Sequence, residues 1–224
     1  METTTKIQAS IESVQETFET AGYTCVNNII DIDTAKLIAQ YALFDLIQNY
    51  NKTDSGDGQV PGSHFVYADP MMEALLLKLH TAVEHATGLQ LYPTYSYYRV
   101  YKPGDTLDKH IDRPACEIST TICIDFDYKE LSNVYTWPIY MNGTPCVLRP
   151  GDGAIYRGCD VAHWRNKFEV PEGSWQVQAF LHYVDANGPH ASFKFDKRPN
   201  IGYKQITQNN EKSISTKKYV TFTE

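Results

Sequence analysis

Apolar and polar positions in the first part of the chain alternate mostly at helical spacing. Residues 7–20 place apolar side chains on one face and predict an amphipathic helix. The β-rich segment 23–30 predicts a short strand that leads into a second helix. That helix is expected to begin at an N-cap residue, either Asp33 or Thr34, and to run to about residue 50.

The stretch 51–63 is polar and rich in Gly, Pro, Ser and Asp, which predicts a loop. A third helix is expected from about Pro70 to Thr87, where Gly88 is a natural helix stop. Its inward face is predicted to carry Leu75, Leu76, Leu79 and Val83.

After residue 90 the pattern changes to short β-branched and aromatic segments separated by the turn signals KPGD, NGT and RPGDG. Several short strands at this spacing are typical of a sandwich or barrel. We therefore predict an α+β protein, a jelly roll with helices that support it from the N-terminal side. Residues 1–89 form the mainly helical support, 90–190 the β core and 191–224 a C-terminal extension in which VTFTE could add an edge strand.

Composition supports this interpretation and narrows the function. The chain has 224 residues, of which 42% are hydrophobic, enough for one packed domain. The net charge of -7 argues against non-specific binding to nucleic acid or to an anionic membrane. The N-terminus lacks a basic segment followed by an apolar one, so no signal peptide is expected. The five cysteines form no CxxC pair and predict reduced thiols in a cytoplasmic protein, or in the host cytoplasm for a phage-encoded one.

The segment DKHIDRPACE, which follows the KPGD turn, carries the strongest chemical signal. Its His110 and Asp112 lie two residues apart, and on an extended segment such residues share a face. His163, in PGDGAIYRGCDVAHWR after a second Pro-Gly turn, offers a third ligand. Two histidines and one carboxylate with open positions form the facial triad of non-haem Fe(II) oxygenases. The alternative for each histidine is a purely structural role.

Residues 20 to 199 resemble the 2-oxoglutarate/Fe(II)-dependent dioxygenase superfamily, and in particular prolyl-4-hydroxylase-like proteins of a type common in phages and marine bacteria. Three segments carry the resemblance in the family's order: YSYYRVYKPGDTLDKHIDRPACEIS, PGDGAIYRGCDVAHWR and QVQAFLHYVD. The resemblance implies a double-stranded β-helix, with His110, Asp112 and His163 as the catalytic metal ligands. It also implies Fe(II), 2-oxoglutarate and O2 as cofactor and co-substrates.

One departure from the family concerns the residue that holds the far carboxylate of 2-oxoglutarate. The family has an Arg or Lys at the start of the strand after the distal histidine, where this chain has Gln176 and Gln178. Arg165 lies two residues after His163, so on a strand it points to the same face, and a guanidinium can clamp a carboxylate. Arg165 is therefore the expected anchor, with Gln176 or Gln178 assisting.

Two further residues belong to the predicted co-substrate site. Arg99 is the rival anchor, because it shares a strand face with Tyr101. Tyr101 matches a family tyrosine that hydrogen-bonds the co-substrate. Arg113, Trp137 and Trp164 are candidates for substrate contacts, with ion pairing or core packing as the alternatives.

The reaction expected from the resemblance is hydroxylation of a C–H bond, because Asp112 fills the ligand position that halogenation typically leaves vacant. The substrate class stays open between an amino acid, a peptidyl proline and another small metabolite. Two different functions also stay open: a non-catalytic jelly-roll binding module, for example for sugar, and a phage structural protein. The oligomeric state cannot be predicted from the sequence.

Overall fold

The computed structural model describes residues 13–49 and 58–203. The first described helix covers residues 13–21, and the rest of the predicted helix at 7–12 lies outside the described residues, as does VTFTE. Among the described helices, none combines the length and the apolar character needed to cross a lipid bilayer.

Two long helices begin and end where side chains satisfy their terminal backbone groups. α2 (Ile32–Asn49) is capped by Asp31, two or three residues before the predicted N-caps Asp33 and Thr34, because the Asp31 carboxylate accepts from the Thr34 backbone N–H at 2.8 Å. α3 (Pro70–Thr87) matches its prediction. Asp69 accepts from the N–H groups of its first turn, and the helix stops at Gly88, whose φ of 70° suits glycine.

Ten strands of the described part of the chain form two antiparallel sheets. The larger sheet has the order β1-β8-β5-β10-β3-β2 and the smaller one β4-β9-β6-β7. The strands of the larger sheet are β1 (Tyr23–Val26), β2 (His64–Tyr67), β3 (Leu91–Tyr101), β5 (Ile118–Asp127), β8 (Gly153–Arg157) and β10 (Trp175–Asp185). Those of the smaller sheet are β4 (Leu107–His110), β6 (Ile139–Met141), β7 (Thr144–Cys146) and β9 (His163–Arg165). The short 3₁₀ segments are η2 (Pro114–Cys116), η3 (Lys129–Leu131) and η4 (Ala191–Lys197).

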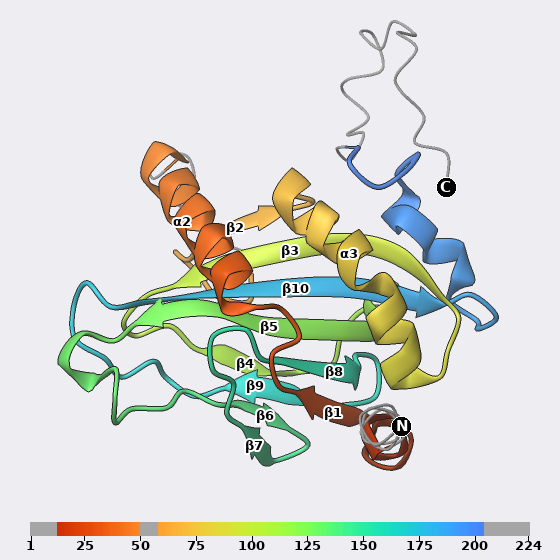
Figure 1. The fold of residues 1–224 in the computed structure, drawn as a ribbon, viewed down its shortest axis with the longest axis horizontal. Coiled ribbons are helices and arrows are strands. Elements are labelled where there is room, and N and C mark those ends of the chain that lie inside the picture. Colours follow the sequence, from red (N-terminus) through yellow and green to blue (C-terminus); the bar gives the residue numbers. More distant parts are fainter. Residues whose placement is uncertain (1–12, 50–57, 204–224) are drawn as a thin grey trace, which may run out of the picture.

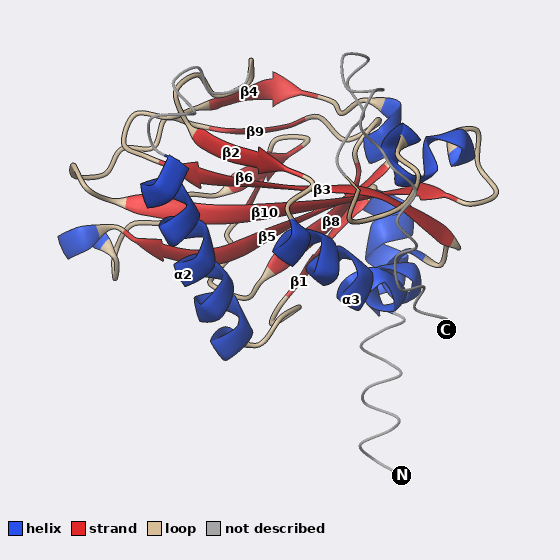
Figure 2. Ribbon diagram, turned by 90° about the horizontal axis from the view of Figure 1, so that it is seen from above, coloured by secondary structure: helices blue, strands red, loops and turns tan. Residues whose placement is uncertain are grey.

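The two sheets and the helices form layers. Figures 1 and 2 show α2 and α3 lying across the outer face of the larger sheet, while the smaller sheet lies on its other side. A large apolar core fills the space between the helices and the sheet, and smaller cores lie toward the second sheet. The predicted α+β double-stranded β-helix with supporting helices is confirmed.

The larger sheet also recruits strands from the N-terminal part of the chain. β1 pairs with β8, and β2 pairs with β3, so both edges of this sheet come from residues before 90. β2 was not expected, because its four residues follow a loop-like stretch and show no alternation. The Asp152 carboxylate shapes the PGDG turn by accepting from the Arg149 N–H at 3.0 Å.

Candidate active site

A cavity of about 470 Å³ lies in the β-helix, and its walls come from β3, β4, β8, β9 and β10 together with the loop after β4. The predicted ligands His110, Asp112 and His163 all line it. His110 and His163 are register partners across β4 and β9, which brings their ring centroids to 4.3 Å. Residues 53 positions apart in the chain thus meet through strand pairing.

The three ligand groups converge on one point. The Nε2 atoms of His110 and His163 each lie 3.6 Å from Oδ1 of Asp112. All three ligand atoms lie within 4.8 Å of one another, close enough to hold one metal ion. The two imidazole nitrogens and one carboxylate oxygen suit Fe(II), and three protein ligands leave positions for further ligands.

Backbone carbonyls orient both histidines. Nδ1 of His110 lies 2.7 Å from the Asp108 carbonyl oxygen, and Nδ1 of His163 lies 2.9 Å from that of Val161. A carbonyl oxygen only accepts, so each Nδ1 must carry the proton and donate. Each Nε2 is then left with a lone pair directed toward the shared point, as a metal ligand requires.

Asp112 lies in a tight loop. Its backbone N–H donates to the Gly158 carbonyl at 2.8 Å, and Ser119 Oγ lies 3.0 Å from its Oδ2. Gly158 is needed there, because a Cβ would lie 2.1 Å from the Cys116 carbonyl oxygen and 2.7 Å from Asp112 Oδ2. Burial opposes ionisation of Asp112, but the neighbouring His110 and His163 side chains outweigh it and hold the pKa of Asp112 below its ordinary value.

A second grouping of possible ligands, Asp112, Cys116 and His182, shares one residue with the first. Tyr95 Oη lies 3.0 Å from the Cys116 sulfur, and burial raises the pKa of this thiol well above its ordinary value. A protonated thiol is a poor metal ligand. The His110, Asp112 and His163 grouping is therefore the candidate metal site.

Arg165 is buried inside the β-helix on the same face of β9 as His163. Its Nη1 donates to the Trp137 carbonyl at 2.6 Å, whereas Nε and Nη2 have no hydrogen-bond partner within the described residues. Nε and Nη2 form one edge of the guanidinium, the edge that can bind a carboxylate through two parallel N–H···O bonds. Burial lowers the pKa of Arg165, which is the expected sign for a cation far from water.

The predicted residues Gln176 and Gln178 are buried on β10. Gln176 Nε2 donates to Gln178 Oε1 at 2.8 Å, and Gln178 Nε2 donates to Thr121 Oγ1 at 2.7 Å. Gln176 also accepts from the Tyr128 hydroxyl. Gln176 is the register partner of Tyr101, which like Tyr128 interacts electrostatically with Arg165.

Arg99, the rival anchor, lines the cavity from β3. It donates to the hydroxyls of Tyr97 at 3.1 Å and Tyr101 at 3.5 Å. Its side chain is therefore held by aromatic hydroxyls, whereas one edge of Arg165 has no hydrogen-bond partner in the described part of the chain.

Arg113 lines the cavity. Its guanidinium forms two 2.8 Å hydrogen bonds with the Asp196 carboxylate and lies 4.6 Å from the Tyr95 ring centroid. Asp196 belongs to η4, so a residue far along the chain holds the side chain that follows the ligand Asp112.

Neither tryptophan proposed for substrate contact is among the described residues that line the cavity. Trp137 is buried in a satellite core, where it stacks on Phe168 and packs against Arg165. Trp164 lies between two inward-facing residues of β9 and therefore points outward, stacked on Tyr140. Strand alternation, read from His163, was the signal that could have excluded Trp164.

The sequence-based reading missed three contributors to the site. Ser119 bridges Asp112 and His182, Tyr156 packs on the His163 ring at 4.7 Å, and Asp196 pairs with Arg113. Ser119 and Tyr156 lie within the segments that carry the family resemblance, but their roles depend on side-chain contacts, and Asp196 meets Arg113 only through the fold. His182 also lines the cavity.

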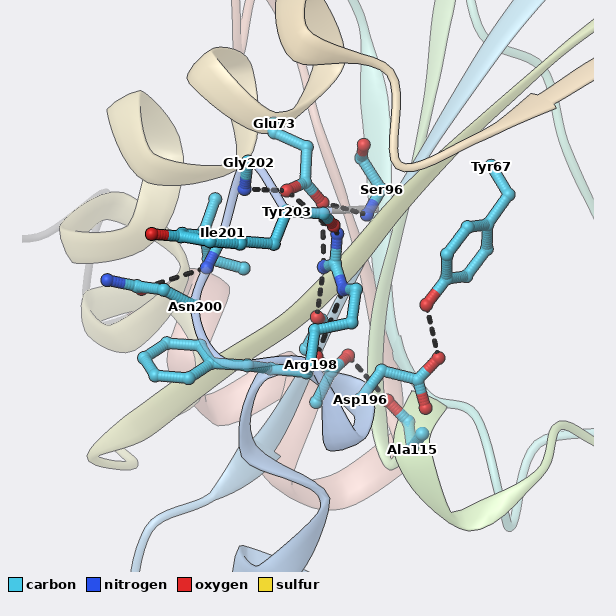
Figure 3. Close-up of polar contacts among 12 residues, drawn as sticks. Tyr67, Glu73, Ser96, Ala115, Asp196, Arg198, Asn200, Ile201, Gly202 and Tyr203 are labelled. Atoms are coloured by element: carbon cyan, nitrogen blue, oxygen red, sulfur yellow. Dashed lines mark hydrogen bonds and ion pairs between the residues drawn. The ribbon is translucent and has the colours of Figure 1, made fainter. Parts of the chain in front are cut away.

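Figure 3 shows how the segment that carries Asp196 is attached. Arg198 donates to both carboxylate oxygens of Glu73 on α3, at 2.9 and 3.1 Å, and to the Thr94 carbonyl on β3 at 2.8 Å. The side chains of Arg198 and Glu73 are 0% and 2% exposed. This buried ion pair ties the segment after β10 to both the helical layer and the sheet.

Among known proteins, the matches to this chain are solved structures. No protein-family model and no curated protein matches the chain. The epimerase SnoN, solved with Fe3+, alpha ketoglutarate and nogalamycin RO, superposes with a TM-score of 0.64 at 14% identity, over 89% of this chain and 94% of that one. The fold is that of the 2-oxoglutarate-dependent oxygenases.

Other solved structures agree with this assignment of the fold. A Pseudomonas putida prolyl-4-hydroxylase matches with a TM-score of 0.57 at 13% identity, over 78% of this chain and 98% of that one. A Trichoplax adhaerens prolyl hydroxylase in complex with a hypoxia inducible factor peptide fragment matches with a TM-score of 0.57 at 14% identity, over 83% and 93%. Similarity at 13–14% identity shows the oxygenase fold alone, and the chemistry depends on this chain's own site.

Proposed function

We propose that this protein is a non-haem Fe(II)- and 2-oxoglutarate-dependent oxygenase that hydroxylates a C–H bond of an amino acid, a peptidyl proline or another small metabolite. The observation that carries the proposal is the convergence of His110, Asp112 and His163, in HxD…H order, inside the cavity of an oxygenase fold. When bound, iron and 2-oxoglutarate together supply the activation of O2.

The protein's own contribution is to hold the ligands and to order the cavity. The carbonyls of Asp108 and Val161 keep both Nε2 atoms unprotonated, and Ser119 supports Asp112. Such partners behind the ligands set ring orientation and ligand basicity. The cavity of about 470 Å³ provides space for a small substrate beside the metal site.

Arg165 is proposed to hold the far carboxylate of 2-oxoglutarate. A buried cation without a counter-charge is costly, and an edge with two unpartnered N–H donors is complementary to a carboxylate. Arg165 is two residues from His163 on the same strand face, which places the guanidinium on the side of β9 that carries the metal site. Tyr101, Gln176 and Gln178 supply polar neighbours at this end.

The metal site is tested with single alanine variants. His163→Ala and Asp112→Ala should abolish iron-dependent succinate formation from 2-oxoglutarate, because each removes one of three ligands. The exposed histidine His85 on α3 provides the matched control, and His85→Ala should leave turnover unchanged. Anaerobic addition of Fe(II) and 2-oxoglutarate should produce a weak visible charge-transfer band in wild type and His85→Ala but not in the two ligand variants. Unchanged turnover in either ligand variant would refute the assignment.

The anchor is tested separately. Arg165→Gln should raise the KM for 2-oxoglutarate by about 10- to 100-fold, the usual scale for removing a hydrogen-bonded charge partner. Nickel affinity, measured by calorimetry, should stay within about twofold. Arg149→Gln, at an exposed arginine, is the control, and Arg99→Gln tests the rival anchor. A KM increase confined to Arg99→Gln would transfer the role to Arg99.

A non-catalytic jelly-roll module, for sugar binding or as a phage structural component, does not account for the three convergent ligand groups. It also leaves unexplained why backbone carbonyls hold both histidines in the tautomer that a metal needs. Absence of the charge-transfer band, together with metal-independent sugar binding, would favour that alternative.

A further inference from the structure

The inner face of the larger sheet carries different side chains at its two ends, so the active site has two distinct parts. On β10 the inward residues are Gln176, Gln178, Phe180 and His182, and their register partners on β3 are Tyr101, Arg99, Tyr97 and Tyr95. Phe180, His182 and their two partners line the cavity, whereas Gln176, Gln178 and Tyr101 are not among its described lining residues. The co-substrate end is therefore the buried end, and the His182 end is left for the substrate.

Hydrogen bonds fix which nitrogen of His182 carries the proton. Ser119 Oγ lies 2.9 Å from His182 Nδ1, 3.0 Å from Asp112 Oδ2 and 3.0 Å from the Cys116 carbonyl oxygen. The serine hydroxyl has one proton, and the carboxylate and the carbonyl can only accept. The serine proton therefore goes to one of those two oxygens, and His182 Nδ1–H must donate to Ser119.

The other nitrogen of His182 then has a lone pair. Burial lowers the pKa of His182 to about 4, so the ring is neutral at physiological pH and carries a single proton, on Nδ1. Nε2 is an acceptor without a hydrogen, on a residue that forms part of the cavity wall. An acceptor in such a wall costs free energy unless a ligand or water donates to it.

The surroundings of His182 are aromatic. The Tyr95 ring centroid lies 4.5 Å from that of His182, and Phe180 and Tyr97 pack next along the same face at 6.0 Å. The rings next to His182 favour an apolar substrate body, while Arg99 and Arg113 add polar groups elsewhere in the cavity lining. The Nε2 acceptor of His182 gives selectivity, because an analogue without the matching donor leaves that acceptor unpaired.

We propose that His182 contacts the substrate and accepts a hydrogen bond from a hydroxyl or N–H group adjacent to the C–H bond that reacts. This inference rests on the proposed oxygenase function and narrows its substrate class. A free amino acid or an amino alcohol carries such a donor, whereas the ring nitrogen of a peptidyl proline has no hydrogen. The substrate is thus a small molecule with a free donor rather than an internal proline of a peptide.

The tautomer is measured directly on the full chain. In 15N NMR of imidazole nitrogens, assigned by comparison with His182→Gln, wild-type His182 should show a protonated Nδ1 and a bare Nε2. A proton on Nε2 would reverse the hydrogen-bond chain and overturn the proposal, whatever the enzyme's activity.

Substrate selectivity is measured with the Fe(II)-loaded enzyme and a panel of free amino acids and amino alcohols. Each compound is paired with its N-trimethylated or O-methylated analogue. Pro-containing peptides are assayed beside the panel. The readout is substrate-stimulated succinate formation. Wild type should prefer the free-donor member by about 10- to 100-fold in kcat/KM, the scale of one buried unpaired group. Equal stimulation by both sets, including none by either, or stimulation by the peptides alone, would overturn the proposal.

Two variants separate substrate contact from structural support. His182→Phe should lose the preference for the donor-bearing compound, and His182→Gln, which keeps an acceptor, should recover part of it. Nickel affinity reports on the metal site independently of the substrate, and it should stay within about twofold of wild type in both variants. A large loss of nickel affinity in His182→Phe would assign His182 to support of Asp112 instead. Failure of the proposed oxygenase function would be distinct, because wild type would then lack basal turnover as well.

Discussion

Removing one partner of the buried ion pair between Glu73 and Arg198 should cost far more folding stability than removing one partner of an exposed pair of similar length. Glu73→Gln preserves the shape of the side chain and removes its charge. In the wild type, this carboxylate accepts two hydrogen bonds from Arg198 and one each from the backbone N–H groups of Ser96 and Gly202. Glutamine replaces one of its two oxygens with an amide that donates, so donors on that side lose their acceptor.

The expected cost follows from burial. Removing one partner of a buried pair leaves an uncompensated charge and typically costs about 3–5 kcal/mol. The side chains here are 0% and 2% exposed at 2.9 Å, whereas the pair Lys129–Asp127 is 39% and 40% exposed at 2.7 Å. An exposed pair contributes about 0–1 kcal/mol, so Asp127→Asn is a control matched in distance but not in burial.

Urea denaturation provides the free energy of unfolding for wild type and both variants. We expect Glu73→Gln to lose about 3 kcal/mol or more and Asp127→Asn less than about 1 kcal/mol. Hydrogen exchange should also rise in residues 191–203, because Arg198 holds this segment against α3 and β3. Equal losses in the two variants would refute the reasoning from burial.

The remaining predictions concern the site itself. His182 has a pKa near 4 in the folded state against an ordinary value of 6.5, so the unfolded chain binds its proton first as the pH falls. In metal-free protein, the His182 side chain should therefore cost no stability above pH 6.5 and about 3 kcal/mol below pH 4. The difference in the free energy of unfolding between wild type and His182→Gln should change by that amount over this pH range. A pH-independent difference would contradict the prediction. Gly158→Ala places a Cβ 2.7 Å from Asp112 Oδ2 and should lower nickel affinity by at least about tenfold, as disturbance of a ligand's supporting groups usually does. Gly58→Ala, where a Cβ meets nothing within 4 Å, is its control, and equal affinities would show that Asp112 does not depend on the close approach.

Local patterns predicted much of the fold. Helical periodicity located α3, including its stop at Gly88, and β-rich segments between Gly and Pro turns located the long strands β3, β5 and β10. They did not predict β2, which is four residues long, because so short a strand depends on its neighbour rather than on its own pattern. The N-cap of α2 was misplaced by two or three residues, since Asp31, Asp33 and Thr34 are all good capping residues and only the chain path selects one.

What the sequence indicated by itself was the three candidate ligands, from spacing, turns and the family resemblance together, and the face of β9 on which Arg165 lies, from the two-residue repeat of a strand. Tertiary structure decided the rest. Only strand pairing shows that His110 and His163 meet, and only packing shows that one edge of Arg165 has no partner among the described residues. The role of His182 likewise depends on Ser119, 63 residues away, because a tautomer is set by what each nitrogen touches.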